Sequence, residues 1–187
     1  MIKDSQGPVG VVIFNDSRFE VANAKTNQMA KIISTCDRCR VLSIENISLG
    51  ETLTEVPKAV DRLIAKFGFS WTHSLGINDL YFDSITYPLR KHGRQDVRNI
   101  SAGDGSFLAL NRIRSGLSTQ VATVAEPTGL QGWQLADELN RAFAGMPPSG
   151  FVSQPILVTS DTLHSSDVYE LGSDIPYKQW YQAIWFE

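Results

Sequence analysis

The chain has 187 residues, of which 42% are hydrophobic and 20% are charged, and its formal net charge is −3 at neutral pH. This composition is typical of a globular protein that buries its core within one domain. The sequence has no basic block interleaved with aromatic residues, which excludes a nucleic-acid-binding footprint, and no apolar run approaches the ~20 residues that span a bilayer.

Predicted strands and helices alternate along the whole chain. A continuous run of apolar and β-branched residues over 9–14 is typical of a strand buried on both faces. Periodicity and turn residues then predict further strands over 40–44, 71–75, 97–102, 119–125 and 155–159. They predict helices over 21–34, 56–67, 79–91, 106–114 and 130–144, the second of them capped by Thr52 or Thr54 and ended by Gly68.

This alternation predicts an α/β fold with a doubly wound parallel sheet and three layers, α/β/α. In such sheets ligands bind beyond the carboxyl ends of the strands. Carboxylates and amides follow the first five predicted strands in turn, namely Asn15, Asp16, Asn46, Asn78, Asp79, Asp104 and Glu126. Asn and Asp also favour turns and helix caps, but five successive strand ends with such residues suit a ligand rich in hydroxyl groups.

The two cysteines, Cys36 and Cys39, lie close together between a predicted helix and a predicted strand. The three histidines show no ligand spacing around this pair, so the sequence predicts no metal site. A thioredoxin-like redox pair would instead open a helix directly after a strand. The pair is therefore either a structural disulfide in an oxidising compartment or two free thiols.

Several catalytic and cofactor motifs are missing. The turn after the first strand contains no glycine, and Gly103-Asp-Gly105 supplies only two glycines of a dinucleotide fingerprint. There is no phosphate-binding loop and no nucleophile elbow. Asp16 and Asp79 fit a metal-assisted phosphoacceptor of the flavodoxin-like receiver type, but the fifth strand ends in Glu126 without the required lysine. The sequence thus predicts neither an enzyme nor a cofactor.

From about Ser74 onward the sequence resembles the second half of ribose-type, type I periplasmic solute-binding proteins of ABC transporters. The residues that carry the resemblance are Gly76-Ile-Asn-Asp79, Asn99-Ile-Ser-Ala-Gly-Asp-Gly105, Ile113-Arg-Ser-Gly116, Thr123-Val-Ala-Glu-Pro127 and Pro155-Ile-Leu-Val-Thr159. The resemblance implies that residues 1–187 form one lobe of a two-lobed protein that closes on a small sugar without catalysis. It also implies that 127–152 cross to the other lobe.

The resemblance assigns individual residues to the ligand site. Asn78 and Asp104 stand where the family binds sugar hydroxyls, and Glu126 replaces a common glutamine. Asn23 stands where the family often has an arginine, for which Arg18 or Lys25 substitutes. Trp71, Tyr81, Phe82 and Trp133 are candidates for stacking on a sugar ring or for the core.

The same resemblance implies a periplasmic protein with a membrane permease as its partner, although Met1 to Pro8 lack the apolar stretch of a signal peptide. The apolar face of the helix Leu130–Ala144 is expected to be poorly covered in this lobe and to favour dimerisation of the fragment. The aromatic tail from Tyr177 to Phe186 is expected to pack as a strap on the lobe. Two alternatives share the fold class: the effector-sensing domain of a sugar-responsive repressor, and a flavodoxin-like enzyme or signalling domain.

Overall fold

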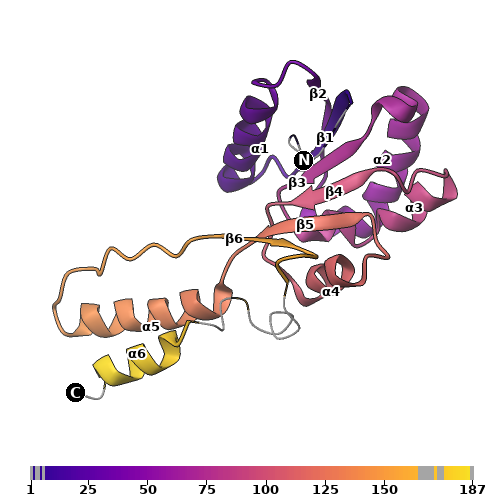
Figure 1. Cartoon of the computed structure of the whole chain (residues 1–187). Helices are drawn as coiled ribbons and strands as arrows, with labels where there is room; N and C mark the ends of the chain where they lie inside the picture. The colour runs from indigo at the N-terminus through magenta and orange to yellow at the C-terminus, as the bar shows by residue number, and fades with distance from the viewer. Residues whose placement is uncertain (1, 3–4, 6, 164–170, 172–174, 186–187) are drawn as a thin grey trace.

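A computed structural model describes residues 2, 5, 7–163, 171 and 175–185. A six-stranded sheet in the order β2-β1-β3-β4-β5-β6 carries helices on both faces (Figure 1). This confirms the predicted three-layer α/β/α fold. The strands are β1 Val9–Asn15, β2 Cys39–Asn46, β3 His73–Gly76, β4 Arg98–Ser101, β5 Gln120–Ala125 and β6 Ile156–Thr159. The α-helices are α1 Glu20–Ile33, α2 Thr52–Phe67, α3 Thr86–Lys91, α4 Phe107–Ser115, α5 Thr128–Phe143 and α6 Tyr177–Trp185.

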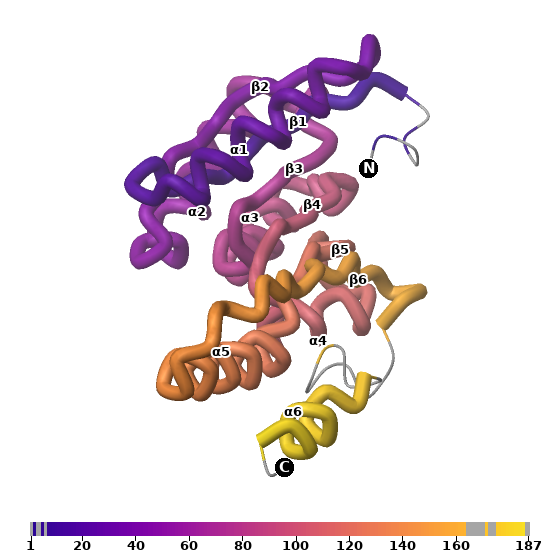
Figure 2. Tube along the Cα trace, turned by 90° about the vertical axis from the view of Figure 1, so that its left-hand side faces the viewer, coloured from indigo at the N-terminus to yellow at the C-terminus, as the bar shows by residue number. Residues whose placement is uncertain are grey.

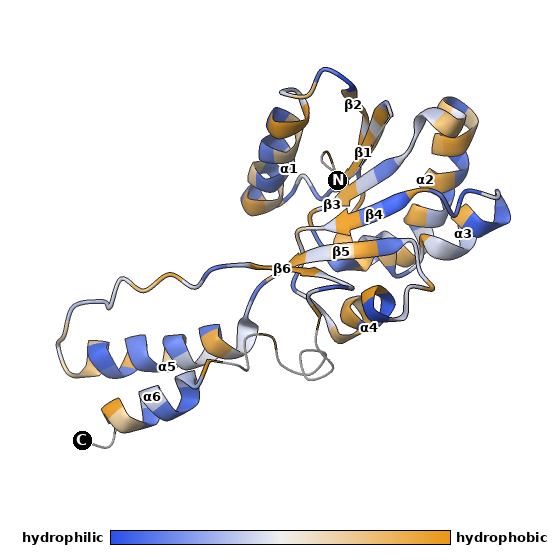
Figure 3. Ribbon diagram, in the orientation of Figure 1, coloured by the Kyte–Doolittle hydropathy of each residue, from blue (hydrophilic) through white to orange (hydrophobic). Residues whose placement is uncertain are grey.

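Strand β1 lies inside the sheet, and all of its residues are buried. Val12 and Phe14 pack against α2 on one face, whereas Val11 and Ile13 pack against α1 on the other. The strand is accordingly hydrophobic along its length (Figure 3). This arrangement explains why the first strand appears in the sequence as an uninterrupted apolar run rather than as an alternating one.

The predicted helix over 79–91 is wrong as a single element. The segment forms a 3₁₀ turn, η3 Asp79–Phe82, followed by the short α3. Pro88 has no amide hydrogen to continue a helix from the preceding turn, and it lies instead in the first turn of α3, where that hydrogen is not needed. The break allows the ring of Tyr81 to stack on Phe14 at 5.6 Å and Phe82 to pack edge-on to the same ring.

The start of α2 also differs from the prediction. Neither Thr52 nor Thr54 caps it, because the hydroxyl of Thr52 donates to the carbonyl of Leu49 and that of Thr54 to the carbonyl of Glu51. The end of α2 is as predicted: Gly68 follows the last helical residue with a φ of 50°, which favours glycine.

The last strand, β6, pairs with β5 in the antiparallel direction, in contrast to the parallel pairing of the other strands. After β5, helix α5 leaves the sheet, and an extended segment over 144–155 runs back beside it (Figures 1 and 2). The chain therefore returns to the sheet beside the carboxyl end of β5, the same end of the strands from which it left. A strand parallel to β5 would have to begin at the opposite end of the strands, which this connection does not reach.

The aromatic tail forms helix α6, not a strap on the sheet, and α6 packs on α5. The Trp133 ring of α5 stacks on Trp185 at 5.2 Å, and the Trp185 indole donates to Asp137 at 2.8 Å. Phe186 of the predicted strap lies outside the described residues. The α5 surface away from α6 is apolar and exposed, with Leu135 at 71% and Phe143 at 82% exposure. None of the described helices is long and apolar enough to cross a membrane.

Candidate functional site

The carboxyl ends of β1, β3, β4 and β5 are level with one another. Along the sheet Phe14 is opposite Gly76, Gly76 opposite Ser101, and Ser101 opposite Thr123. The segments that follow these strands therefore begin at a common edge, which we call the carboxyl edge. It carries the side chains that the sequence predicts as ligand-binding: Asn15, Asp16, Asn23, Asn78, Asp79, Asp104 and Glu126.

Asn78 and Asp104 are brought together at this edge. The Asn78 amide nitrogen donates to Asp104 Oδ2 at 3.0 Å, and Asn78 Oδ1 accepts from the Leu80 amide at 3.0 Å. Asp104 is exposed, and its other carboxylate oxygen has no hydrogen-bond partner among the described residues. Helix α4 is capped by the Ser106 hydroxyl, which accepts from the Ala109 amide at 3.2 Å. Asp104 is therefore not its N-cap, and its carboxylate is available to a ligand.

Asp79, unlike its neighbour Asn78, lies under the loop and does not face outward. Its side chain is 1% exposed. One carboxylate oxygen accepts from the Ser101 hydroxyl and from the Gln120 amide at 2.9 Å. The other accepts from the backbone amides of Gly105 at 2.9 Å and Ser106 at 3.1 Å. Asp79 thus holds the loop that presents Asp104.

The two glycines beside Asp104 are required by this packing. A Cβ at Gly103 would lie 2.7 Å from the Asp79 backbone nitrogen. Gly105 has a φ of 71°, and a Cβ there would lie 2.5 Å from the Cβ of Ala125. Side chains at either position would push the loop away from the sheet, so the glycines fix where the Asp104 carboxylate lies.

The amides at the end of β1 are occupied by one another. Asn15 is buried, and its nitrogen donates to Asn23 Oδ1 at 3.0 Å and to Asn46 Oδ1 at 2.8 Å. The Asn23 nitrogen in turn donates to the Ser17 carbonyl at 2.9 Å. Asn15 and Asn23 therefore tie α1 and β2 to the end of β1, and Asn46 is the exposed member of the group.

Asp16 is also occupied, in this case by a cation. The Arg18 guanidinium donates to both Asp16 carboxylate oxygens, at 2.9 and 2.6 Å, and the Leu49 amide donates at 3.0 Å. The hydrogen bond from Arg18 holds the pKa of Asp16 well below its usual range, even though burial opposes ionisation. Arg18 itself is 61% exposed and presents its positive charge at the carboxyl edge.

Glu126 is paired with Lys25, one of the two cations that the sequence suggests in place of an arginine. The Lys25 ammonium lies 3.8 Å from Glu126 Oε1 and donates to the Ala102 carbonyl at 2.9 Å. Lys25 thereby joins α1 to the segments after β4 and β5. Both side chains remain partly exposed, at 30% and 43%. Sequence reasoning did not predict the supporting roles of Ser101, Gln120 and Ala102, because only the folded sheet brings them beside the site.

The predicted stacking aromatics belong to the core or to the projecting helices. Trp71, Tyr81 and Phe82 are fully buried, and the Tyr81 hydroxyl donates to the Ile47 carbonyl at 2.8 Å. Burial raises the pKa of Tyr81 above its usual value. Trp133 packs against α6. The polar groups of the carboxyl edge therefore have no aromatic platform from these four residues.

Two described cavities lie away from the carboxyl edge. The described cavities of about 730 and about 370 Å³ are lined by residues at the starts of the strands, at the opposite edge of the sheet. Within the part of the chain that the structure describes, no cluster of His, Cys, Asp or Glu is arranged to hold a metal ion. The arrangement can accept hydrogen bonds from a polar ligand and donate hydrogen bonds to it.

No protein-family model and no curated protein sequence matches the chain, whereas solved structures match its fold. An ABC transporter solute-binding protein from Agrobacterium vitis with bound allitol superposes with a TM-score of 0.72 at 19% identity, covering 86% of this chain and 57% of its own. A Caulobacter myo-inositol binding protein bound to myo-inositol gives 0.73 at 20% identity, covering 91% and 57%.

A sugar ABC transporter structure from Yersinia enterocolitica matches with a TM-score of 0.76 at 16% identity, over 98% of this chain and 59% of its own. At these identities the comparison establishes a shared fold, that of a type I periplasmic-binding-protein lobe. The neighbours are binding proteins rather than enzymes. The chain spans somewhat more than half of their length.

Proposed function

We propose that this chain is one lobe of a sugar-binding protein that serves an ABC transporter, and that its carboxyl edge forms one wall of the sugar site. The observation that carries the proposal is the Asn78–Asp104 pair, held by the buried Asp79 beside the Lys25–Glu126 pair. The fold supports it, because structural neighbours contain bound allitol, D-allose and myo-inositol.

The chemistry of the carboxyl edge suits a ligand with several hydroxyl groups. The Asp104 carboxylate accepts hydrogen bonds from hydroxyls, while the Asn78 amide donates to one oxygen and accepts from another. Near α1, the cations Lys25 and Arg18 supply hydrogen-bond donors to the carboxyl edge. Among the described residues of this edge, no nucleophile lies beside a base, and we propose binding without catalysis.

We propose that a second lobe closes the site from the other side. Residues 127–152, which include α5, would pack in that lobe, and its core would cover the exposed face formed by Leu135, Leu139 and Phe143. Burying these side chains is favourable at about 25 cal/mol per Å². We therefore assign this face to the second lobe of the same protein and not to a dimer of the fragment.

The proposed function is tested by comparing this chain with the two-lobed protein by calorimetry, using a panel of neutral sugars and polyols. We expect the two-lobed protein to bind one of them tightly and this chain alone to bind it at least about a hundredfold more weakly, because one wall leaves the ligand hydroxyls in water. Equal affinity in both would show that one lobe is a complete site. No binding by either would contradict the proposed function.

The proposed function also implies an exported protein that delivers its ligand to a membrane permease. The structure joins Cys36 and Cys39, whose Cα atoms are 5.2 Å apart, by a disulfide at the turn between α1 and β2. A disulfide there suits an oxidising compartment such as the periplasm. A cytosolic repressor domain would keep both thiols reduced.

We expect the protein to contain no free thiol when it is produced in the periplasm. The measurement is thiol titration of denatured, unreduced protein, with a reduced sample as the control that reveals both cysteines. The double variant Cys36→Ser with Cys39→Ser gives the background reading. Two free thiols in periplasmic protein would contradict an exported role and favour the repressor alternative.

A further inference from the structure

The edge of the sheet opposite the proposed sugar site is rich in basic residues. In parallel βα units, the carboxyl ends of helices lie at the same edge as the starts of strands. The last turns of α1 to α4 and the segments that lead into β2, β4 and β5 place there Lys31, Arg38, Arg40, Lys66, Arg90, Lys91, Arg94, Arg98 and Arg114. We call this group the basic edge. The carboxylates of the same segments are Asp37 and Asp96.

Helix dipoles explain part of the basic edge, but not all of it. Cations in the last turn of a helix are stabilised by the negative end of its dipole, which accounts for Lys31, Lys66 and Lys91. Arg40 and Arg98, however, lie in the strands β2 and β4. Both are exposed, and neither side chain has an ion-pair or hydrogen-bond partner among the described residues. Their charges are therefore not neutralised within the described part of the chain.

Other members of the basic edge have internal roles. Arg94 is buried and donates to the carbonyls of Gly68 and Trp71 and to the Asp96 carboxylate. Asp96 is thereby neutralised. Arg38 donates to the carbonyl of Gly7 at 2.9 Å. Asp37 and Asp161, which follows the end of the antiparallel β6, are exposed carboxylates at this edge, and Asp61 pairs with His92. The unpaired cations of the described residues outnumber these carboxylates, so the balance of free charge is positive.

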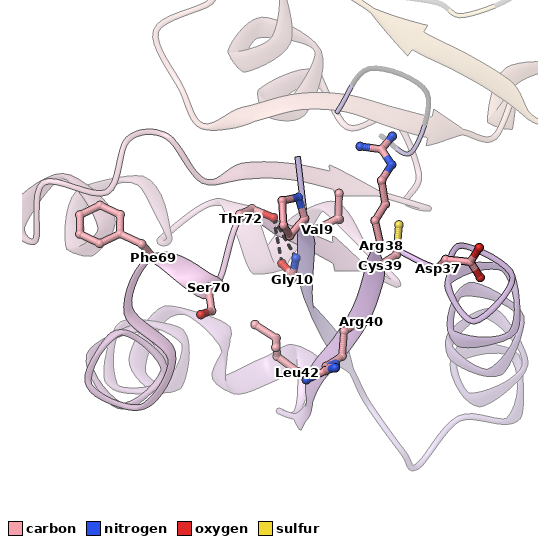
Figure 4. Close-up of a pocket in the computed structure, with 11 residues that line it drawn as sticks. Val9, Gly10, Asp37, Arg38, Cys39, Arg40, Leu42, Phe69, Ser70 and Thr72 are labelled. Carbon is pink, nitrogen blue, oxygen red and sulfur yellow. Dashed lines mark hydrogen bonds between the residues drawn. The ribbon is translucent and has the colours of Figure 1, made fainter. Parts of the chain in front are cut away.

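A cavity of about 730 Å³ opens within the basic edge (Figure 4). Arg38 and Arg40 lie on one side of it, Phe69 lies on the other, and the start of β1 lies between them. Gly10 allows the Ser70 backbone to pack closely against the start of β1 in the cavity wall, since a Cβ there would lie 1.8 Å from the Ser70 carbonyl oxygen. Phe69 is 81% exposed, and Leu117, at the same edge before β5, is 80% exposed.

We infer that the basic edge docks on an anionic membrane surface, with the cavity beside Arg40 receiving a lipid phosphate headgroup. Charge complementarity supports this occupant, as do the exposed Phe69 and Leu117, because peripheral membrane surfaces combine basic residues with apolar side chains that enter the headgroup layer. The strands also begin close to level, with Val9 opposite Cys39 and His73 opposite Arg98. A row of strand starts suits a planar partner better than a rounded acidic protein.

The test is co-sedimentation of this chain with vesicles of phosphatidylglycerol and phosphatidylcholine, and with vesicles of phosphatidylcholine alone. We expect binding to the anionic vesicles at about 0.1 M salt and its loss at about 0.5 M, where screening shortens the reach of the charges. The double variant Arg40→Glu with Arg98→Glu is expected to bind at least about tenfold more weakly. The matched control, Lys58→Glu with Arg62→Glu, changes the net charge equally on α2, where both residues pair with glutamates.

Three results would overturn the inference. Equal loss in the control variant would show that only net charge matters, and absence of binding to anionic vesicles would remove the membrane partner. Capture by immobilised poly-glutamate without vesicle binding would identify an acidic protein as the partner instead. Inorganic phosphate that displaces the protein from vesicles at equal salt would support the headgroup cavity. These results are independent of sugar affinity, so they do not depend on the proposed function.

Discussion

Replacing Asp79 with asparagine is expected to lower the free energy of unfolding by about 3 kcal/mol, although the side chain keeps its shape. Each Asp79 carboxylate oxygen accepts two hydrogen bonds. Oδ1 accepts from the Ser101 hydroxyl and the Gln120 side-chain amide, and Oδ2 accepts from the Gly105 and Ser106 backbone amides. An amide nitrogen on either side would face two donors in a buried place. Hydrogen bonds to a charged acceptor contribute about 1.5–3 kcal/mol each, and unsatisfied buried donors add a penalty.

Urea unfolding of this chain measures the effect. Asp37→Asn is the matched control, because the Asp37 side chain is exposed and has no hydrogen-bond or ion-pair partner among the described residues. This substitution is expected to change stability by less than about 0.5 kcal/mol. A stability loss in Asp79→Asn no larger than that of the control would show that the four donors are satisfied by water, and that Asp79 does not hold the loop.

Most of the sheet is predictable from the sequence, because each strand's burial leaves a local pattern. The apolar run over 9–14 predicts β1, and Gly68 and Gly116 mark the ends of α2 and α4. The direction of β6 and the packing of α6 on α5 are not predictable in this way. They depend on where a long connection returns and on the contacts of Trp133, which no local pattern encodes.

The candidate site is predictable only in part, for a similar reason. The rule that ligands bind beyond strand ends selects one edge of the sheet, and the fold places Asn78, Asp104 and Glu126 at that edge. It does not separate outward-facing residues from those that hold the edge together. Asp79 directly follows Asn78 in sequence, yet it is buried by partners from β4 and β5 that are distant in sequence. The sequence likewise does not reveal that Asp16 is bound by the Arg18 guanidinium and by the Leu49 amide, 33 residues away.

Replacing Asp104 with asparagine in the two-lobed protein is expected to weaken sugar binding at least tenfold, which corresponds to ~1.4 kcal/mol. Charge-assisted bonds from sugar hydroxyls to a buried carboxylate contribute about 1.5–3 kcal/mol each, and asparagine retains one acceptor oxygen without the charge. The melting temperature is expected to stay nearly unchanged, because Asp104 is exposed, its described side-chain partner is Asn78, and Ser106 caps α4 in its place.

Calorimetric titration with the sugar measures the role of Asp104 in binding, and a thermal melt on the same samples measures its role in stabilising the fold. Asp37→Asn, the same chemical change at the opposite edge, is the control and should leave affinity unaltered. Asn78→Ser retains an oxygen for the Leu80 amide but loses the donor to Asp104, and it should also weaken binding without unfolding η3. Unaltered affinity in Asp104→Asn would leave the exposed carboxylate without a ligand, and the Asn78–Asp104 pair would no longer support a sugar site at this edge.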